Sequence, residues 1–307
     1  MSNIVKYKNG NYHVMLDLDN GTKIRYNNDD ELIPEFPESM DICISKRCSV
    51  GCVMCHEQCS PNGKHGDIMN AKFIDNLHPY TELALNGNEP LHPDLIPFLE
   101  KCKKLKLIPS LTVNQKTFMN NIDLLKSLYD RKYIYGMGVS FNSIHDPSMP
   151  SSHTSAFLSY LKWFPNAVVH IINGIVTIDE LKLLSVNDFK LLILGYKRFG
   201  RGIGYYDNCN HEVEYKKSRL HDMLPQIIKE QWFNVVSFDN LAIEQLDVKN
   251  LMSDNEWQRF YCGDDGTFTF YVDLVNNKFA QSSTSIKRYD LLDDAKYMFD
   301  VIRSTKE

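Results

Sequence analysis

In the stretch DICISKRCSVGCVMC, residues 41–55, a short run of β-favouring residues leads directly into three cysteines, Cys48, Cys52 and Cys55, spaced C-x3-C-x2-C. Three thiolates on one short loop can hold three irons of a cubane cluster and leave the fourth iron without a protein ligand. Gly51 lets such a loop turn tightly at little steric cost, because glycine has no Cβ. The stretch therefore predicts a strand that carries a metal-binding loop at its carboxyl end.

Downstream of this stretch, short β-rich runs alternate with helix-length segments. Strands are expected near residues 41–45, 81–86, 109–114, 135–142, 167–176 and 189–195. Helices are expected near residues 70–77, 93–105, 118–130, 152–163 and 178–186. Parallel neighbouring strands need a crossover connection of this length, so the alternation predicts an α/β fold with a parallel sheet over residues 40–205. The pattern leaves open whether the sheet closes on itself.

Both ends of the chain differ from this alternating region. Before residue 40, apolar residues recur at every second position from Tyr12 to Leu18, and the turn signal Asp19-Asn20-Gly21 follows, so residues 1–39 are expected to form a β-hairpin and a connector. Residues 206–307 are expected to form a small α+β extension. Its elements are a helix at 213–231, a strand at 235–238, a hairpin at 267–280 and a helix at 290–303.

The composition limits the kinds of protein that this can be. The chain has 307 residues, a formal net charge of -5 and a pI near 6.1, so no basic surface indicates a phosphate-backbone partner. The first residues lack a long apolar stretch, and no run of about 18 apolar residues occurs. We therefore expect a cytoplasmic protein with no membrane partner. Four of the eight cysteines lie within residues 48–59, which indicates metal ligation rather than disulfides.

A structural zinc site is an alternative for the cysteine loop. Zinc takes four thiolates, and Cys48, Cys52, Cys55 and Cys59 could supply them. Zinc ribbons and knuckles usually pair two short cysteine motifs across a longer gap, whereas these four cysteines lie on one loop. We therefore favour the iron–sulfur interpretation and leave Cys59 unassigned.

The C-x3-C-x2-C spacing resembles the signature of the radical S-adenosylmethionine (SAM) superfamily, and the resemblance covers residues 40–205. It implies a partial (β/α)6 TIM-like barrel, a 4Fe-4S cluster held by Cys48, Cys52 and Cys55, and SAM as a further cofactor. In the family an aromatic residue often precedes the last cysteine and covers the adenine side of SAM. Here that position is Met54, a polarisable side chain that can still contact a ring.

A second motif stands at the end of the next expected strand. Gly87-Asn88-Glu89-Pro90 looks like the family's Gly-Gly-Glu-Pro segment, whose backbone and acid bind the amino group of SAM. Asn88 replaces the usual second glycine, and asparagine tolerates unusual backbone angles better than most residues. A Gly-x-Glu-Pro segment alone is a common turn, but its place after the cysteine loop strengthens the resemblance.

Further strand ends supply weaker cofactor candidates. By the same resemblance, Ser140 and Asn142 are placed to contact the ribose or carboxylate of SAM, and Asn114 is placed to contact its edge. Gly174 lies on the fifth expected strand, near its end, and is a fourth candidate. Each of these is equally well read as an ordinary residue at a strand end.

The resemblance also implies a reaction. One electron from the cluster would cleave SAM into methionine and a 5'-deoxyadenosyl radical, which would abstract a hydrogen from a substrate. This chemistry needs the low end of iron–sulfur potentials, hence an external electron donor of the flavodoxin or ferredoxin type. Tyr261-Cys262-Gly263 and the hairpin that follows look like a degenerate SPASM or twitch extension, which favours a peptide or protein substrate.

Two other functions stay open. Modification of a nucleoside, nucleotide or base is the alternative within the enzyme class, with residues 197–202 as a segment that could contact a phosphate or carboxylate and aromatic side chains that could stack on a base. Both features also fit a solvated loop and ordinary core packing. A non-catalytic iron–sulfur or zinc binding module is the alternative outside that class, and the Gly-x-Glu-Pro segment argues against it.

The remaining cysteines predict that there is one cluster only. Cys43 within a strand and Cys102 within an apolar helix are interpreted as small core residues. Beyond residue 205 only Cys209 and Cys262 occur, and a cluster bound by protein alone takes four thiolates.

Overall fold

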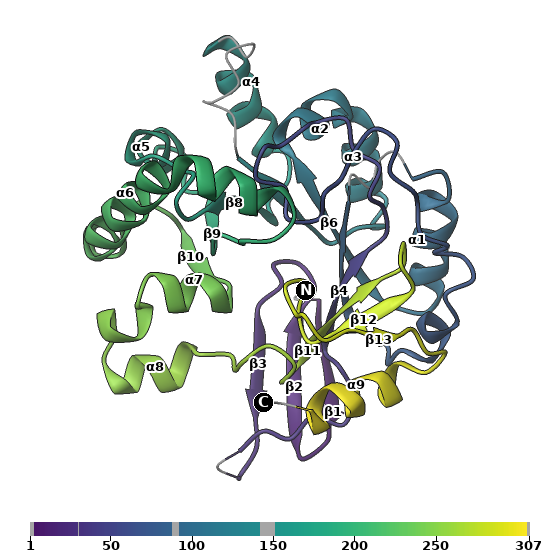
Figure 1. Ribbon diagram of the computed structural model, residues 1–307. Coiled ribbons are helices and arrows are strands. Elements are labelled where there is room, and N and C mark those ends of the chain that lie inside the picture. Colours follow the sequence, from purple (N-terminus) through teal and green to yellow (C-terminus); the bar gives the residue numbers. More distant parts are fainter. Residues whose placement is uncertain (1–2, 30, 88–91, 142–150, 306–307) are drawn as a thin grey trace.

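A ten-stranded, mostly parallel sheet organises the chain, which is a mixed α/β protein (Figure 1). The computed structural model describes residues 3–29, 31–87, 92–141 and 151–305, without the side chains of residues 151–154. The order of strands is β10-β9-β8-β7-β6-β5-β4-β11-β12-β13, and every pair from β10 to β11 is parallel. The parallel strands are β4 (Ser39–Cys43), β5 (Glu82–Asn86), β6 (Ile108–Asn114), β7 (Gly136–Ser140), β8 (Ala167–Ile172), β9 (Lys190–Leu194), β10 (Val235–Phe238) and β11 (Thr269–Asp273).

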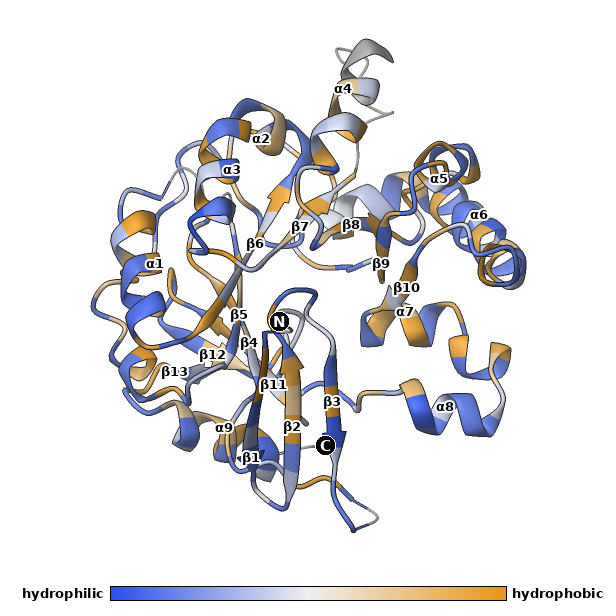
Figure 2. Cartoon of the chain, turned by 180° about the vertical axis from the view of Figure 1, so that it is seen from behind, coloured by the Kyte–Doolittle hydropathy of each residue, from blue (hydrophilic) through white to orange (hydrophobic). Residues whose placement is uncertain are grey.

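Helices connect the parallel strands and cover one face of the sheet. Figure 1 shows the strands along an arc, with α1, α2, α3, α5 and α6 on its outer side. Figure 2 shows these helices striped orange and blue, as expected where one face packs on a sheet. Their bounds are η1 (Lys72–Asn76), α1 (Leu95–Lys104), α2 (Gln115–Asn120), α3 (Ile122–Asp130), α4 (Ser151–Leu161), α5 (Ile178–Ser185) and α6 (Arg201–Lys229).

The two faces of the sheet differ in burial. Side chains on the helix-covered face, such as Leu111, Val169 and Ile193, are fully buried in one large apolar core. The alternate residues of the same strands, such as Thr112 and His170, are only half-buried. Because successive side chains of a strand point to opposite faces, the second set lies on the inner side of the arc. We call this side of the sheet the inner face.

The N-terminal segment forms a separate three-stranded antiparallel sheet. Its strands are β1 (Ile4–Asn9), β2 (Tyr12–Asp17) and β3 (Lys23–Tyr26), in that order. The predicted hairpin is therefore present as β2 and β3, whereas β1 was not predicted. A left-handed Gly10, with φ +59°, joins β1 to β2.

Buried charges attach this small sheet to the large one. Glu38, just before β4, is 1% exposed. It accepts hydrogen bonds from Arg25 at 2.9 Å and from the Tyr12 hydroxyl at 2.5 Å, and it forms an ion pair with Lys23 at 3.1 Å. Lys23 also pairs with Glu82 at the start of β5. A buried carboxylate is stable only with such partners. The N-terminal sheet and the amino ends of β4 and β5 therefore stabilise each other.

The residues beyond 205 extend the large sheet at both ends. β10 pairs with β9, and β11 pairs with β4 on the opposite side, in the register Thr269↔Ser39 to Asp273↔Cys43. The predicted hairpin is formed by β11 and β12 (Lys278–Ala280), and β13 (Tyr289–Asp290) completes this edge. The other elements are α7 (Asn240–Gln245), η3 (Val248–Leu251), α8 (Asp254–Phe260) and α9 (Ala295–Ser304). None of the helices in the described ranges combines the length and the apolar run that crossing a membrane requires.

Several predicted bounds were wrong for local reasons. The strand predicted at 167–176 ends at Ile172, because Gly174 turns the chain with φ +84°. The helix predicted at 118–130 is two helices, α2 and α3, separated at Asn121. The helix predicted to start at residue 213 begins at Arg201, and Cys209 has non-helical backbone angles inside it.

Candidate functional site

The loop that carries the three cysteines follows β4 and is closed by its own backbone. Arg47 and Ser60 form an isolated bridge, in which the Cys48 amide donates to the Ser60 carbonyl at 2.8 Å. The Ser60 amide in turn donates to the Lys46 carbonyl at 3.0 Å. These bonds bring the two stems together, so residues 48–59 form a compact loop at the carboxyl edge of the sheet. We call this segment the cysteine loop.

The thiols of the cysteine loop lie close enough to affect one another. Cys48, Cys52 and Cys55 are half-buried. Burial, with the neighbouring Cys55 and Cys48, raises the pKa of Cys52 to about 11. A hydrogen bond from the buried Cys59 thiol lowers the pKa of Cys55 to about 6, and the same contact raises the pKa of Cys59. The structure therefore places Cys59, which the sequence left unassigned, against Cys55.

The donor set of the loop fits an iron–sulfur cluster by its chemistry. Soft thiolate ligands select iron–sulfur clusters, zinc and copper(I), and three half-buried thiols on one loop are such a set. In the described part of the chain, no three His, Cys, Asp or Glu side chains, those of the cysteine loop included, are grouped to hold one metal ion. The fit is therefore one of ligand chemistry.

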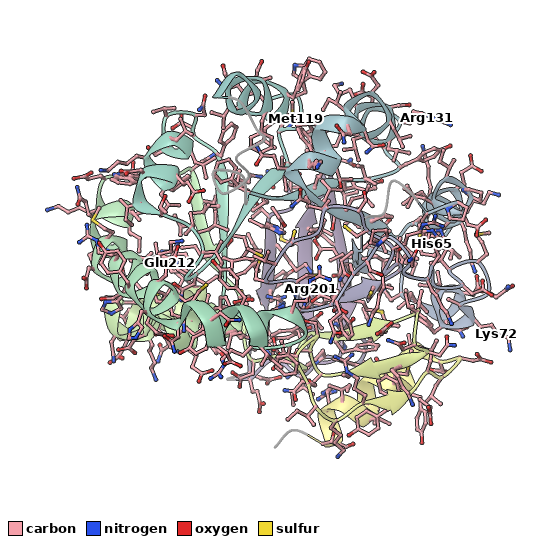
Figure 3. The ribbon with its side chains drawn as sticks, turned by 45° about the horizontal axis from the view of Figure 1, so that its top comes forward. His65, Lys72, Met119, Arg131, Arg201 and Glu212 are labelled. Carbon is pink, nitrogen blue, oxygen red and sulfur yellow. The ribbon has the colours of Figure 1, made fainter. Side chains whose placement is uncertain are left out.

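Arg201, in the first turn of α6, holds the cysteine loop in place. Its guanidinium donates to the Cys52 carbonyl at 3.0 Å and to the Cys59 carbonyl at 2.8 Å, while its backbone amide donates to the Cys55 carbonyl at 3.1 Å. In Figure 3 Arg201 lies near the centre of the view, whereas Lys72 lies at its periphery. A Cβ on the preceding Gly200 would lie 2.5 Å from the His56 carbonyl oxygen, so only glycine permits this approach.

Sequence reasoning missed this role of Arg201. It treated residues 197–202 as a segment that could contact a phosphate or carboxylate, but the Arg201 guanidinium binds backbone carbonyls. The signal that could have indicated close packing is the Gly-Arg-Gly triplet, residues 200–202, at the start of a helix.

Asn114 is the predicted cofactor residue that lies nearest to the cysteines. Its side-chain nitrogen is 3.8 Å from the Cys52 sulfur, and its side-chain oxygen accepts a hydrogen bond from the Lys116 amide at 2.8 Å, which caps α2. The cap fixes the orientation of the amide, so its NH2 group points toward the cysteine loop. Ser140 pairs with Asn114 across β6 and β7 and is half-buried at the same edge.

The other predicted cofactor residues lie at different places. Gly87 directly follows β5 with φ +108°, and a Cβ there would be 1.9 Å from the Ser45 carbonyl oxygen. Asn88, Glu89 and Asn142 lie outside the described residues. Gly174 faces α6, because a Cβ there would be 2.7 Å from a methyl group of Val213.

Met54 packs into a small apolar cluster. The cluster consists of Ile175, Tyr196 and Val213, and lies between the cysteine loop and α6. These contacts fix the loop side chain that precedes the last cysteine.

Buried polar atoms without partners mark the carboxyl ends of three strands. Within the described residues, no hydrogen bond reaches the side-chain oxygens of Asn86 and Asn173 or the side-chain nitrogen and oxygen of Gln115. These residues follow or end β5, β8 and β6, respectively. Buried polar groups are normally satisfied, so these atoms can serve a bound polar molecule. They were not among the predicted site residues.

Two titratable groups on the inner face complete the site. Asp41 of β4 keeps an exposed surface, but the protein atoms around its carboxyl displace part of the water and raise its pKa to about 6. Burial and then the Lys197 charge lower the pKa of His170 on β8 to about 4, so its imidazole is neutral at pH 7. A Cβ on Gly138 would be 2.2 Å from the His170 ring, so glycine makes room for it.

A cavity of about 240 Å³ lies at the other end of the sheet. It is lined by residues at the amino ends of the strands, among them Glu82, Ile108 and Lys190, and by Leu16 and Asn20 of the N-terminal sheet. Active sites of parallel α/β proteins lie at the carboxyl ends of the strands, so we do not assign the chemistry to this cavity.

Comparison of the chain with protein-family models and with curated protein sequences found no match. The assignment of a function therefore depends on the residues and the geometry described above.

Proposed function

We propose that the chain is a radical SAM enzyme whose Cys48, Cys52 and Cys55 hold a 4Fe-4S cluster at the mouth of a partial (β/α)6 TIM-like barrel. The observation that carries the proposal is the position of Asn114, with its amide 3.8 Å from the Cys52 sulfur. β6, which Asn114 ends, is two strands away from β4, so the cysteine loop extends over the carboxyl edge of the sheet. That edge is where parallel α/β folds place their sites.

We assign the following roles to residues of the chain. The three thiols would ligate iron, while Arg201 keeps the loop backbone in one conformation. Glu89 would accept a hydrogen bond from the amino group of SAM, and the strand-end amides of Asn114 and Asn86 offer polar contacts to the same molecule. When bound, the cluster and SAM together supply a 5'-deoxyadenosyl radical that abstracts a hydrogen from the substrate. The inner face would hold that substrate and limit the entry of water.

The partners follow from this chemistry. An external low-potential donor of the flavodoxin or ferredoxin type would supply the electron, and we expect the protein to act in the cytoplasm. We favour a peptide or protein substrate, from the likeness of residues 261–280 to a degenerate SPASM or twitch extension. A nucleoside, nucleotide or base is the alternative substrate.

A non-catalytic zinc or iron–sulfur module is the second candidate function. The hydrogen bond between the Cys59 and Cys55 thiols favours it, because that contact brings a fourth sulfur to the loop. Four thiolates would complete a closed structural zinc site with no open position for SAM.

Metal analysis and a product assay separate the two candidates. Anaerobically reconstituted protein should contain about four irons per chain, for the one cluster that the cysteines allow, and should form 5'-deoxyadenosine from SAM after reduction. The Cys48→Ala, Cys52→Ala and Cys55→Ala variants should each lose both properties, whereas Cys102→Ala, in α1, should keep them. Stoichiometric zinc without iron would disprove the enzyme proposal.

A further inference from the structure

Two positively charged side chains from opposite sides of the sheet meet at one serine. Lys197 follows β9, and its ammonium donates to the Ser283 hydroxyl at 3.0 Å. Arg288, just before β13, donates to the Ser283 carbonyl at 2.6 Å. Both cations are half-buried. β13 ends the order of strands and β9 is the second strand from its other end, so this contact bridges the open side of the arc.

Neither cation has a carboxylate partner within the described residues. Lys46, two residues before the cysteine loop, shows the usual arrangement, since it pairs with Asp273 at 3.0 Å and with Glu57 at 3.4 Å. No ion pair of this kind involves Lys197 or Arg288 in the described ranges. Arg288 lies over the ring of the buried Tyr271 instead, with 5.1 Å between the guanidinium carbon and the ring centre.

The carboxylates nearest to Lys197 do not neutralise the pair of cations. The Lys197 charge acts on the carboxyls of Asp41 and Asp265, but no ion pair joins it to either within the described residues. Asp239, a third carboxylate, acts on both of these carboxyls. Asp239 accepts hydrogen bonds from two backbone amides, and Asp265 accepts one from Asn240.

We propose that Lys197, Arg288 and Ser283 form a binding site for an oxyanion, a carboxylate or a phosphate, of the substrate. Like charges that converge in a half-buried place repel each other, and a bound anion removes that cost. Guanidinium and ammonium groups beside a hydroxyl are the donors that recognise carboxylates and phosphates. Ser282, Thr284 and Ser285 surround the same turn with further hydroxyls.

The oxyanion site lies beside the cysteine loop, so we assign its ligand to the substrate. This assignment rests on the proposed function. Tyr271, beneath Arg288, donates a hydrogen bond to Glu57 of the cysteine loop at 2.9 Å. A Cβ on Gly202, next to Arg201, would lie 2.3 Å from the Lys197 carbonyl oxygen, so Lys197 also adjoins the start of α6. An anion bound here would tie one end of a molecule beside the cysteine loop, and the inner face is left for the rest.

Calorimetry on the full chain tests the site without the reaction. Inorganic phosphate and glutarate are titrated into the anaerobically reconstituted parent, Lys197→Met, Arg288→Met, Ser283→Ala and Lys72→Met. Lys72 is an exposed control, paired with Asp293 at 2.8 Å. We expect affinity for the preferred anion to fall about tenfold in each cation variant, because a charge-assisted hydrogen bond is lost, and to stay at the parent value in Lys72→Met.

The two anions distinguish the source of the ligand. Tighter phosphate binding indicates a phosphorylated substrate such as a nucleotide, whereas tighter glutarate binding indicates an acidic peptide or other carboxylate. Ser283→Ala, which removes only one hydroxyl, keeps the test valid if a cation variant fails to fold. Equal affinities in all variants, or no binding of either anion at millimolar concentration, would overturn the site.

A second measurement separates this inference from the proposed function. SAM binding and iron content are determined in the same variants, and both should match the parent. If Lys197→Met loses SAM binding and phosphate competes with SAM, the site belongs to the cofactor and the inference is wrong. If the parent holds zinc and forms no 5'-deoxyadenosine while the anion still binds, the proposed function fails and the oxyanion site survives.

Discussion

Replacing Arg201 by methionine should release the cysteine loop from α6 while the rest of the fold stays intact. The change removes two hydrogen bonds from a charged donor, to the carbonyls of Cys52 at 3.0 Å and Cys59 at 2.8 Å, but keeps the backbone bond to Cys55. Hydrogen bonds with one charged partner contribute about 1.5–3 kcal/mol each. The loop is half-exposed and water can replace part of the loss, so we expect the lower end, about 3 kcal/mol for the two bonds.

Hydrogen–deuterium exchange measures this opening directly. Exchange of the loop amides reports local opening, and 3 kcal/mol corresponds to about a 100-fold increase in the opening equilibrium. We expect that increase in peptides that cover residues 48–60, and none in peptides that cover α3. The metal-free protein suffices, so the result does not depend on a cluster.

Arg198→Met is the matched control, because Arg198 is the exposed partner of Asp207 at 3.4 Å. Exposed ion pairs contribute about 1 kcal/mol at most, so loop exchange should rise by less than about fivefold. Equal exchange of residues 48–60 in the two variants would refute the assignment of Arg201 as the anchor of the loop.

Four further predictions concern single positions. Gly87→Ala should lower the free energy of unfolding in urea by more than about 2 kcal/mol, since its Cβ would collide with a carbonyl oxygen 1.9 Å away. Gly51→Ala, with φ +76° and open space around its Cβ, should lower the free energy of unfolding about half as much. Equal losses in the two variants would contradict the contact at Gly87. Cys59→Ala should keep about four irons per chain, and its failure to do so would favour the four-thiolate site. Glu89→Gln should weaken SAM binding about tenfold with the iron retained, and an unchanged dissociation constant would argue against its role. The pKa of Asp41 is raised from 3.8 to about 6 in the folded chain, so the folded state binds the proton more tightly and loses stability as pH rises through this interval. Asp41→Asn should therefore be more stable than the parent at pH 7 but not at pH 3.5. The same difference in stability at both pH values would contradict the shift.

The parallel strands could be predicted from the sequence because each is short, apolar and bounded by polar residues. The strand expected at 81–86 is β5, Glu82–Asn86, and the one expected at 109–114 is β6, Ile108–Asn114. β1 was missed because only one of its residues is fully buried, so its pattern resembles a solvated segment. The start of α6 was missed because Gly202 and Gly204 lower helix propensity, and tertiary contacts with the cysteine loop and with Tyr196 stabilise this turn.

The sequence alone did not predict which segments pair when they are far apart in the chain. The signal for β11 predicted a strand but not its partner, since β-propensity describes a pleated surface and not a neighbour. The proximity of Asn114 to the cysteine loop followed from a general rule, because the carboxyl ends of parallel strands meet at one edge. The contacts of Arg201 with Cys52 and Cys59 are tertiary, about 140–150 positions apart in the chain, and no local pattern encodes them.

The pairing of β4 with β11 has a consequence for the order in which the molecule is assembled during synthesis. The partner strand Thr269–Asp273 leaves the ribosome long after Ser39–Cys43, and so does Phe268, whose carbonyl accepts from the Glu38 amide at 2.9 Å. Until then β4 has one open edge, and contacts between such distant segments form slowly because a long loop must close first. The support beneath the cysteine loop is therefore among the last parts of the molecule to be completed, and a chain that stops before residue 268 leaves it unfinished.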